Sequence, residues 1–92
     1  MYRIISATAR PGFLVDLTWE DGSRSSIDFR PLLQGEVFAP LRDPAWFAAH
    51  VAVEEDGHAL GWPGELHFSA DSLWYRTHPE DLKRDYPEAA AE

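Results

Sequence analysis

The chain contains no cysteine and few basic residues. The lack of cysteine excludes a disulfide, a thiolate zinc site and a thiol nucleophile. The 92 residues include eight Lys and Arg against sixteen Asp and Glu, for a net charge of −8. Because each phosphate contact needs Lys or Arg, this balance argues against direct binding of nucleic acid.

Long apolar runs and familiar catalytic motifs are also absent from the sequence. No stretch approaches the roughly 18–20 apolar residues of a membrane helix, and the first residues do not resemble a signal peptide. There is no Gly-x-Ser-x-Gly block and no phosphate-binding loop. We therefore expect a soluble cytoplasmic protein that is not an enzyme, has no catalytic residues, needs no cofactor and does not associate with membranes.

Acidic residues are concentrated in the second half of the chain. Residues 51–92 carry ten acids and three basic residues, whereas residues 1–50 carry six acids and five basic residues. The two halves therefore have net charges of −7 and −1. Negative charge concentrated in one half of the chain favours binding to a basic surface on another macromolecule, because complementary charge speeds association and helps to select the partner.

The first third of the chain has the pattern of an antiparallel meander. Apolar and polar residues alternate over residues 13–19, and Ile27 and Phe29 are again two positions apart. The acidic and glycine-containing segment 20–23 is typical of a hairpin turn. One buried face is therefore expected on three strands. Their expected bounds are 3–7, 13–19 and 24–29.

The sequence after the meander predicts a second hairpin and short helices. Asp43 followed by Pro44 is a helix start, because the Asp side chain caps free backbone N–H groups and Pro suits the first turn. A hairpin is expected from residues 51–54 and 58–62. Other expected elements are a helical turn at 31–33, extended residues at Leu66 and Phe68, a helix over 69–75, a helix opened by Pro79 and a frayed end at 87–92. The fold class is α+β: an antiparallel three-stranded meander plus a second hairpin, packed with two or three short helices.

Two sequence blocks resemble a known family. Residues 38–47 read Phe-Ala-Pro-Leu-Arg-Asp-Pro-Ala-Trp-Phe, and residues 57–66 read Gly-His-Ala-Leu-Gly-Trp-Pro-Gly-Glu-Leu, with a Val-x-Val strand between them. In this order the blocks resemble the bacterial domain-of-unknown-function family 2442. The resemblance implies a single small α+β domain over residues 1–76. Residues 77–92 are then an acidic C-terminal extension, either a short helix or disordered.

The family also suggests kinds of partner. Some members are fused to a helix-turn-helix domain, and some are candidate antitoxins encoded beside candidate toxins. No catalytic residues are established for the family, so none are carried over. The extension after Tyr75 is too short to be a helix-turn-helix domain, which removes the family's direct route to reading DNA.

Acidic side chains of the second half are the candidate partner-binding residues. They cluster at the tip of the second hairpin and continue on the elements that follow, while one tryptophan at a hairpin end adds an apolar anchor. The set comprises Glu54, Glu55, Asp56, Trp62, Glu65, Asp71, Glu80 and Asp81. The alternative interpretations are a solvated face that aids solubility and, for Trp62, ordinary packing in the core.

Two further groups of polar residues can be interpreted as sites. One has the ligand density of a metal site and comprises His58, Glu65, His67 and Asp71. A Pro-Gly break divides this group and no second His lies at helical spacing, so we expect no metal. The other is Asp16 with Asp28, on neighbouring strands, as an acid–base pair. Both point away from the apolar face, so we expect solvated carboxylates.

These observations favour a non-enzymatic module that docks on a basic protein or nucleoprotein and inhibits or neutralises it. The partner is then a toxin, for an antitoxin, or a nucleic-acid-handling effector, for a DNA-mimicking phage inhibitor of a CRISPR complex. The alternative is a regulatory module that senses a ligand or peptide in a pocket between the sheet and the helix after Asp43. Because an exposed meander edge can pair two copies, we expect a monomer or a weak homodimer.

Overall fold

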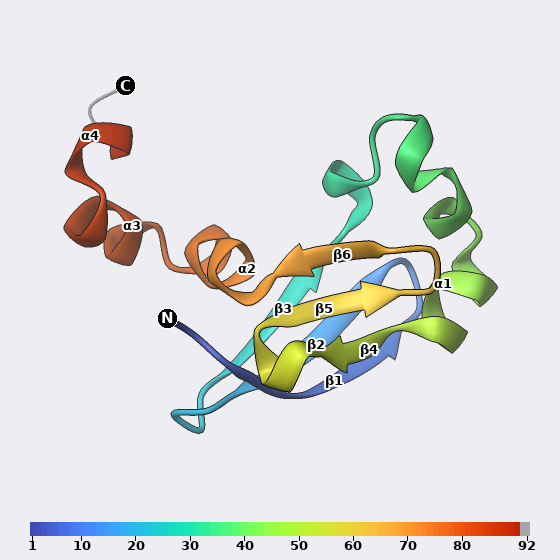
Figure 1. Ribbon diagram of the computed structural model, residues 1–92, viewed down its shortest axis with the longest axis horizontal. Helices are drawn as coiled ribbons and strands as arrows, with labels where there is room; N and C mark the ends of the chain where they lie inside the picture. Colours follow the sequence, from blue (N-terminus) through green and yellow to red (C-terminus); the bar gives the residue numbers. More distant parts are fainter. Residues whose placement is uncertain (91–92) are drawn as a thin grey trace.

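Two antiparallel sheets form the body of the molecule. The computed structural model describes residues 1–90. The first sheet is a β1-β2-β3 meander, and the second has the order β4-β5-β6 (Figure 1). The strands are β1 Ile4–Arg10, β2 Leu14–Trp19, β3 Arg24–Asp28, β4 Ala52–Glu54, β5 Ala59–Trp62 and β6 Leu66–Ser69. The predicted meander and second hairpin are confirmed, and the residues expected to be extended at Leu66 and Phe68 form a third strand beside the hairpin.

Short helices connect and follow the strands. The 3₁₀ segments are η1 Arg30–Leu32, η2 Glu36–Arg42 and η3 Glu55–Gly57, and the α-helices are α1 Pro44–His50, α2 Ala70–Thr77, α3 Pro79–Asp85 and α4 Pro87–Ala90. The predicted start of α1 is confirmed: Asp43 Oδ1 accepts from the backbone N–H groups of Ala45 at 3.0 Å and Trp46 at 3.3 Å. Ser69 caps α2 in the same way, through Ser72 N–H at 3.2 Å. Segment η2 was not expected, because Pro40 interrupts its pattern.

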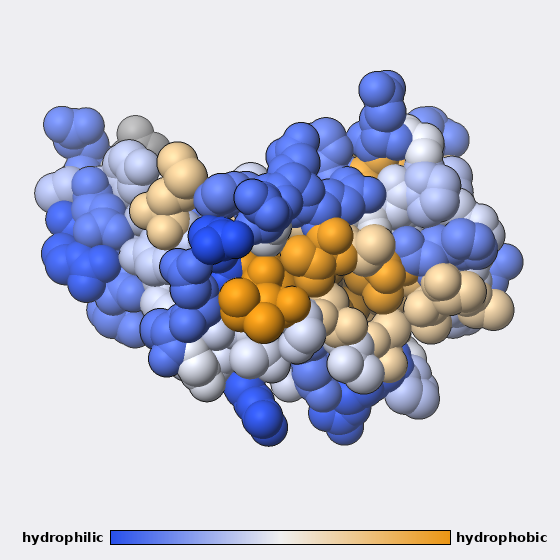
Figure 2. Space-filling view, turned by 60° about the horizontal axis from the view of Figure 1, so that its bottom comes forward, coloured by the Kyte–Doolittle hydropathy of each residue, from blue (hydrophilic) through white to orange (hydrophobic). Residues whose placement is uncertain are grey.

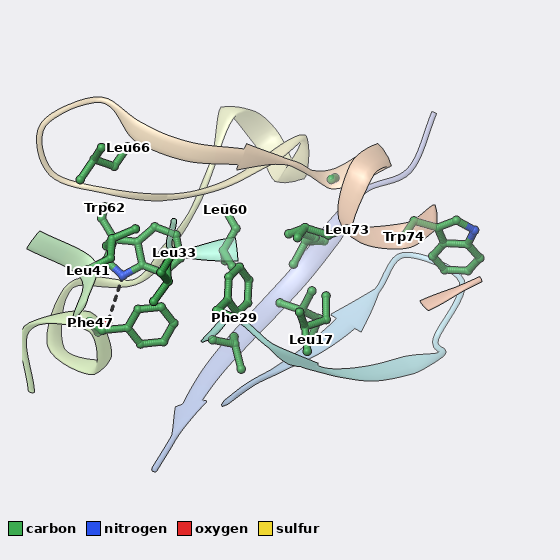
Figure 3. Packing of buried hydrophobic residues seen from close by; sticks show 14 of the residues in the cluster. Leu17, Phe29, Leu33, Leu41, Phe47, Leu60, Trp62, Leu66, Leu73 and Trp74 are labelled. Carbon is green, nitrogen blue, oxygen red and sulfur yellow. Dashed lines mark hydrogen bonds between the residues drawn. The ribbon is translucent and has the colours of Figure 1, made fainter. Parts of the chain in front are cut away.

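The core lies between the facing sides of the two sheets. Val15, Leu17 and Trp19 alternate along β2 as predicted and are at most 2% exposed. From the second sheet, Leu60 and Trp62 approach them, and Phe47 of α1 closes one end (Figure 3). Its ring lies 5.0 Å from that of Trp62 and 5.7 Å from that of Phe29, measured between centroids. Helix α1 is therefore held on the sheets by an aromatic cluster.

The placement of Trp62 at a surface is wrong. Trp62 is 2% exposed, and its Nε1 donates to the backbone oxygen of Phe47 at 2.9 Å (Figure 3). The physical reason is strand alternation: Trp62 is two residues after Leu60 and lies on the same, core-facing side of β5. Its single polar group finds a partner inside the core, so it is a packing residue and not an exposed anchor.

The C-terminal helices extend from the end of α2, on the side where the N-terminus lies (Figure 1). Residues 77–92 were expected to be a short helix or disordered; the described part forms α3 and α4, and residues 91–92 of the expected frayed end lie outside the described residues. Trp74 of α2 stacks on Tyr2 at a centroid distance of 4.4 Å and on His78 at 3.8 Å. Within residues 1–90, no helix has the length and apolar character needed to cross a membrane.

Candidate partner-binding groove

The second sheet has one face in the core and one face turned outward. Strand pairing places Glu54 opposite Ala59, and Gly61 opposite His67, on the outward face. The core face carries Leu60 and Trp62. Because side chains alternate along a strand, the short sequence of β4 sends Val53 inward and Glu54 outward. A polar surface therefore covers the outer side of β4, β5 and β6.

Gly61 leaves room for an acidic side chain to lie across this face. A Cβ atom at Gly61 would collide with the carboxylate of Glu54. The Glu54 side chain therefore lies over the backbone of β5 and is half-buried there. The missing side chain of Gly61, the central glycine of the second sequence block, leaves the space that the Glu54 carboxylate occupies.

A shallow hollow of about 700 Å³ opens beside Glu54. Its lining, which we call the acidic groove, consists of Glu54, Glu55, Trp62, Pro63, Gly64, Glu65 and His67. Two turns supply most of these residues: η3, which follows β4, and the tight turn between β5 and β6. The structure thus brings together three of the predicted acids, Glu54, Glu55 and Glu65, from positions up to eleven residues apart.

Three acids of these turns have unfavourable backbone conformations. In residues 1–90, four non-glycine residues have a positive φ, and three of them are Glu55 at 52°, Asp56 at 61° and Glu65 at 63°. The left-handed region costs a residue with a Cβ atom about 1–2 kcal/mol relative to its ordinary conformations. Glycine would avoid this cost. The chain therefore carries carboxylates at positions where stability alone favours glycine.

The acids around the acidic groove differ from other acids of the chain in their ion pairs. Among the side chains of residues 1–88, no Lys or Arg forms an ion pair with Glu54, Glu55, Asp56 or Glu65. Elsewhere, arginines neutralise carboxylates in the pairs Arg3–Glu20, Arg10–Asp16, Arg30–Asp28, Arg84–Asp81 and Arg84–Asp85. None of these four carboxylates is therefore neutralised by an ion pair within the described side chains, although the Arg3 guanidinium, which pairs with Glu20, also donates to the backbone oxygen of Asp56 at 2.9 Å.

The other predicted acids lie away from the acidic groove. Asp71, on α2, accepts from the backbone N–H of Tyr2 at 2.8 Å. Glu80 is exposed in the first turn of α3. Asp81 accepts from Trp74 Nε1 at 2.9 Å and pairs with Arg84. Asp71 and Asp81 thus hold the chain's own segments together, and neither lines the acidic groove.

Asp85 carries the largest lowering of a carboxyl pKa in this helical region. It accepts from Arg84 Nε at 2.8 Å and from the Tyr75 hydroxyl at 2.7 Å, through its two different oxygens. The Arg84 guanidinium, followed by the Tyr75 hydroxyl, lowers the pKa of Asp85 from 3.8 to about 2. The same contact raises the pKa of Tyr75, because the phenol must keep its proton to donate this hydrogen bond to Asp85.

The two remaining polar groups do not form a metal or acid–base cluster within the described residues. No three of the His, Asp and Glu side chains there lie close enough together to hold a metal ion. Asp16 accepts from Ser26 Oγ at 2.6 Å and pairs with Arg10, while Asp28 pairs with Arg30. The Ser26 hydroxyl lowers the pKa of Asp16, and the Arg30 guanidinium lowers the pKa of Asp28. Both carboxylates therefore stay charged at neutral pH.

The region between α1 and the sheets is packed. Phe47, the buried residue of α1, meets Phe29 and Trp62 there (Figure 3). The hollow beside this region, of about 320 Å³, opens near η1 and is lined by Phe13, Arg30, Leu33, Gln34 and Arg42. Aromatic side chains therefore pack between α1 and the sheets.

Sequence reasoning missed two features of the acidic groove. His67 was considered only as a metal ligand, but it lines the groove opposite Gly61. The left-handed conformations were not anticipated either, although Asp56-Gly57 and Gly64-Glu65 are turn sequences that could have indicated them. The place of His67 depends on pairing between β5 and β6, which a single sequence indicates weakly.

Comparison with known proteins identifies a family. No curated protein and no solved structure matches the chain. The model of one family, described as "Protein of unknown function (DUF2442)", matches residues 4–79. This range contains both sheets, α1, α2 and the whole acidic groove, and it ends at the first residue of α3. The chain therefore belongs to this family, as its two sequence blocks predicted.

Proposed function

We propose that this protein is a non-enzymatic binding module that docks through its acidic groove on a basic surface of a partner protein or nucleoprotein and inhibits or neutralises it. The partner class is a toxin or a nucleic-acid-handling effector. In the first case the chain acts as an antitoxin. In the second it acts as a DNA-mimicking inhibitor, as a phage protein directed against a CRISPR complex would.

The observation that carries this proposal is the gathering of unpaired carboxylates around one hollow. Glu54, Glu55 and Glu65 line the acidic groove, and no Lys or Arg of the described chain pairs with them. Solvated acids are also found on proteins without partners, where they aid solubility. The left-handed φ values of Glu55 and Glu65 favour the binding role, because solubility does not require acids at strained positions.

The absence of Lys and Arg from the residues that line the acidic groove supports a basic partner. The charged side chains of the acidic groove are three glutamates, beside His67. Phosphate groups would be repelled from such a surface, whereas Lys and Arg side chains would gain charge-assisted hydrogen bonds. The proposal therefore includes no direct contact with nucleic acid and no membrane, and it places the protein in the cytoplasm with its partner.

The test compares two triple variants of equal charge. Glu54, Glu55 and Glu65 are changed to Gln in one, and Glu20, Glu36 and Glu88, which lie outside the acidic groove, are changed to Gln in the other. Each variant and the wild-type chain is used to isolate partners from the native host. We expect the groove variant to lose a basic partner that the wild-type chain and the matched variant retain.

Salt dependence of binding provides the second half of the test. With the isolated partner, the association rate should fall steeply as salt rises, because screening weakens attraction between opposite charges. Equal association rates at low and high salt would contradict the proposal, as would equal binding by the two triple variants. Genes neighbouring this one then distinguish a toxin from an effector of nucleic-acid defence.

A further inference from the structure

A second hollow, of about 420 Å³, opens at the helical end of the molecule, where η1, β6, α2 and α3 meet. Its volume lies within the range of sites that bind small ligands, about 300–1,000 Å³. None of its lining residues lines the acidic groove. The lining consists of Leu32 of η1, Phe68 of β6, Leu82 of α3, and Ser72, Leu73, Tyr75 and Arg76 of α2.

Most of this lining is apolar. Leu73 is 1% exposed and forms the floor, whereas the partly buried Leu32, Phe68 and Leu82 form the sides. On the face of the molecule that Figure 2 presents, the helical end, at the left, carries mostly hydrophilic side chains. The hollow is therefore a local apolar surface in a largely hydrophilic region, and covering it with a hydrocarbon or aromatic group would be favourable.

The polar residues of the lining differ in how far the chain already uses their groups. The Tyr75 hydroxyl donates to Asp85 at 2.7 Å, and the Ser72 hydroxyl donates to the backbone oxygen of Ser69 at 3.0 Å. Arg76 is exposed and forms no ion pair with any of the described carboxylates. A guanidinium has five N–H donors and no acceptor, so Arg76 determines which polar group the hollow attracts.

Carboxylates around the hollow are engaged by other arginines. Arg30, which holds the two oxygens of Asp28 at 3.0 and 2.7 Å, is the main cause of the lowered pKa of that carboxyl, and the charge of Arg76 adds to it. Asp85 is paired with Arg84. Salt screens more distant carboxylates beyond about 8 Å at physiological ionic strength. The hollow thus combines an apolar surface with a positive charge that lacks a counter-ion.

Two other arginines without ion pairs do not offer this combination. Arg24 lines a hollow on the outer face of the first sheet, where most of the neighbouring side chains are Ser and Thr. Arg42 Nε donates to the backbone oxygen of Leu33 at 2.9 Å, and its Nη2 donates to that of Gly35. Arg42 therefore serves its own chain, and Arg24 lacks apolar surroundings.

We propose that the hollow at the helical end binds a small monocarboxylic acid with an apolar body, whose carboxylate pairs with Arg76. A guanidinium holds a carboxylate through two parallel hydrogen bonds, while an alkyl or aryl body covers Leu73 and the three side walls. Because the lining supplies one cation, the ligand carries one negative charge and not the two of a phosphate monoester. The inference is independent of the acidic groove and its partner.

The position of Leu82 connects the ligand to the C-terminal helices. The family match ends at residue 79, so Leu82 lies beyond it, whereas Leu32, Phe68 and Leu73 lie within it. A bound acid therefore contacts the family domain and α3 at the same time. Binding should hold α3 against α2, which makes the amide of Leu82 a reporter of occupancy.

Octanoate is the probe for this site, and 1-octanol, which has the same chain without the charge, is its control. Each is titrated at neutral pH into the isotopically labelled chain, and the backbone amide shifts are followed by NMR. We expect octanoate to shift the amides of residues 72–76 and Leu82 to saturation, and octanol to bind about tenfold more weakly or less, since charged hydrogen bonds are lost. Shifts confined to other parts of the chain, no saturable binding of octanoate, or equal affinity for the two compounds would overturn the proposal.

Two charge-matched variants assign the effect to one arginine. Arg76→Gln should raise the dissociation constant of octanoate about tenfold or more and leave that of octanol unchanged, whereas Arg24→Gln should change neither. Arg76→Lys should restore part of the affinity, because it keeps the charge but loses the two-pronged geometry. Thermal unfolding without ligand checks that each variant folds. Equal affinity of Arg76→Gln and Arg24→Gln for octanoate would overturn the proposal.

Other occupants of the hollow give different results in the same experiment. A second copy of the chain would shift the amides of residues 72–76 as the protein concentration rises, without any ligand. An acidic segment of a partner protein would be indicated by a short peptide with a C-terminal leucine that binds where octanoate does not. Either result would overturn the proposal.

Discussion

Acidic residues play different structural parts at the two ends of this molecule. On α3, Asp81 and Asp85 are engaged by Trp74, Tyr75 and Arg84 within the same chain. Around the acidic groove, Glu55 and Glu65 have no such partners in the described residues and adopt strained conformations. The carboxylates of the helical end stabilise the fold, whereas those of the sheet end cost stability. This difference supports the proposed binding role of the acidic groove.

The helical end is held by a stack of rings that includes the N-terminal segment. Tyr2 and His78 sandwich Trp74, with interplanar angles of 11° and 3°. The ring of Trp19 meets Trp74 edge-on at 5.0 Å. Tyr2 and all of α3 beyond its first residue lie outside the family match. Two segments outside the family match are therefore joined through a tryptophan of the family domain.

The largest expected effect comes from removing this tryptophan. Trp74→Ala should lower the free energy of unfolding by about 3–5 kcal/mol, because it leaves a cavity and releases Tyr2, His78 and Asp81. Urea unfolding measures the change. Trp46→Ala is the control at the sheet end, where the ring is half-buried, and should cost less. Equal losses in the two variants would contradict the role assigned to the stack.

The next largest effect compares a hydrogen-bonded acid with a solvent-exposed acid on the same helix, α3. Asp81→Ala should lower the free energy of unfolding by about 1–3 kcal/mol, because the part-buried Nε1 of Trp74 loses a charged acceptor. The neighbouring Glu80 is exposed, and Glu80→Ala should change stability by less than about 0.5 kcal/mol. Chemical denaturation of both variants provides the comparison.

A smaller effect of opposite sign is expected at the acidic groove. Glu65→Gly should raise the free energy of unfolding by about 0.5–1 kcal/mol, because glycine adopts the left-handed conformation without strain and this gain exceeds its entropic cost. Calorimetry measures the shift in unfolding temperature. If the proposed function is correct, the same variant binds the partner more weakly. A destabilised Glu65→Gly chain would show that the carboxylate has an unrecognised structural role.

The smallest effect is a pH dependence at the helical end. The pKa of Asp85 is about 2 in the folded chain, below its ordinary 3.8. A lowered pKa means that the ionised carboxylate contributes stability above pH 3.8, and that this contribution is lost as the pH falls through about 2. Tyrosine fluorescence during acid titration should report release of Tyr75. In Asp85→Asn this transition should disappear, while one that persisted would have to arise from another group.

Local sequence patterns predicted the elements that depend on interactions between residues close together in the sequence. The alternation in residues 13–19 follows from one buried strand face, and the Asp43-Pro44 start of α1 follows from hydrogen bonds within three residues. Trp62 was misplaced because the Pro-Gly turn after it resembles a surface feature, and only its pairing with Leu66 shows which side it faces. The acidic groove was predicted in part: its acids were named, but their grouping with His67 was not.

The sequence by itself determined the meander, the second hairpin, the helix starts, the family and the excess of negative charge. These follow from contacts between near neighbours or from composition. Only the tertiary structure decided which acids are free and which are engaged, because that depends on side chains far apart in sequence, such as Tyr2 and Asp85, separated by 83 positions. Tertiary structure also decided that β4 of the second sheet lies beside β1 of the first, since the placement of the two sheets is set by their packing and not by the pattern of any one strand.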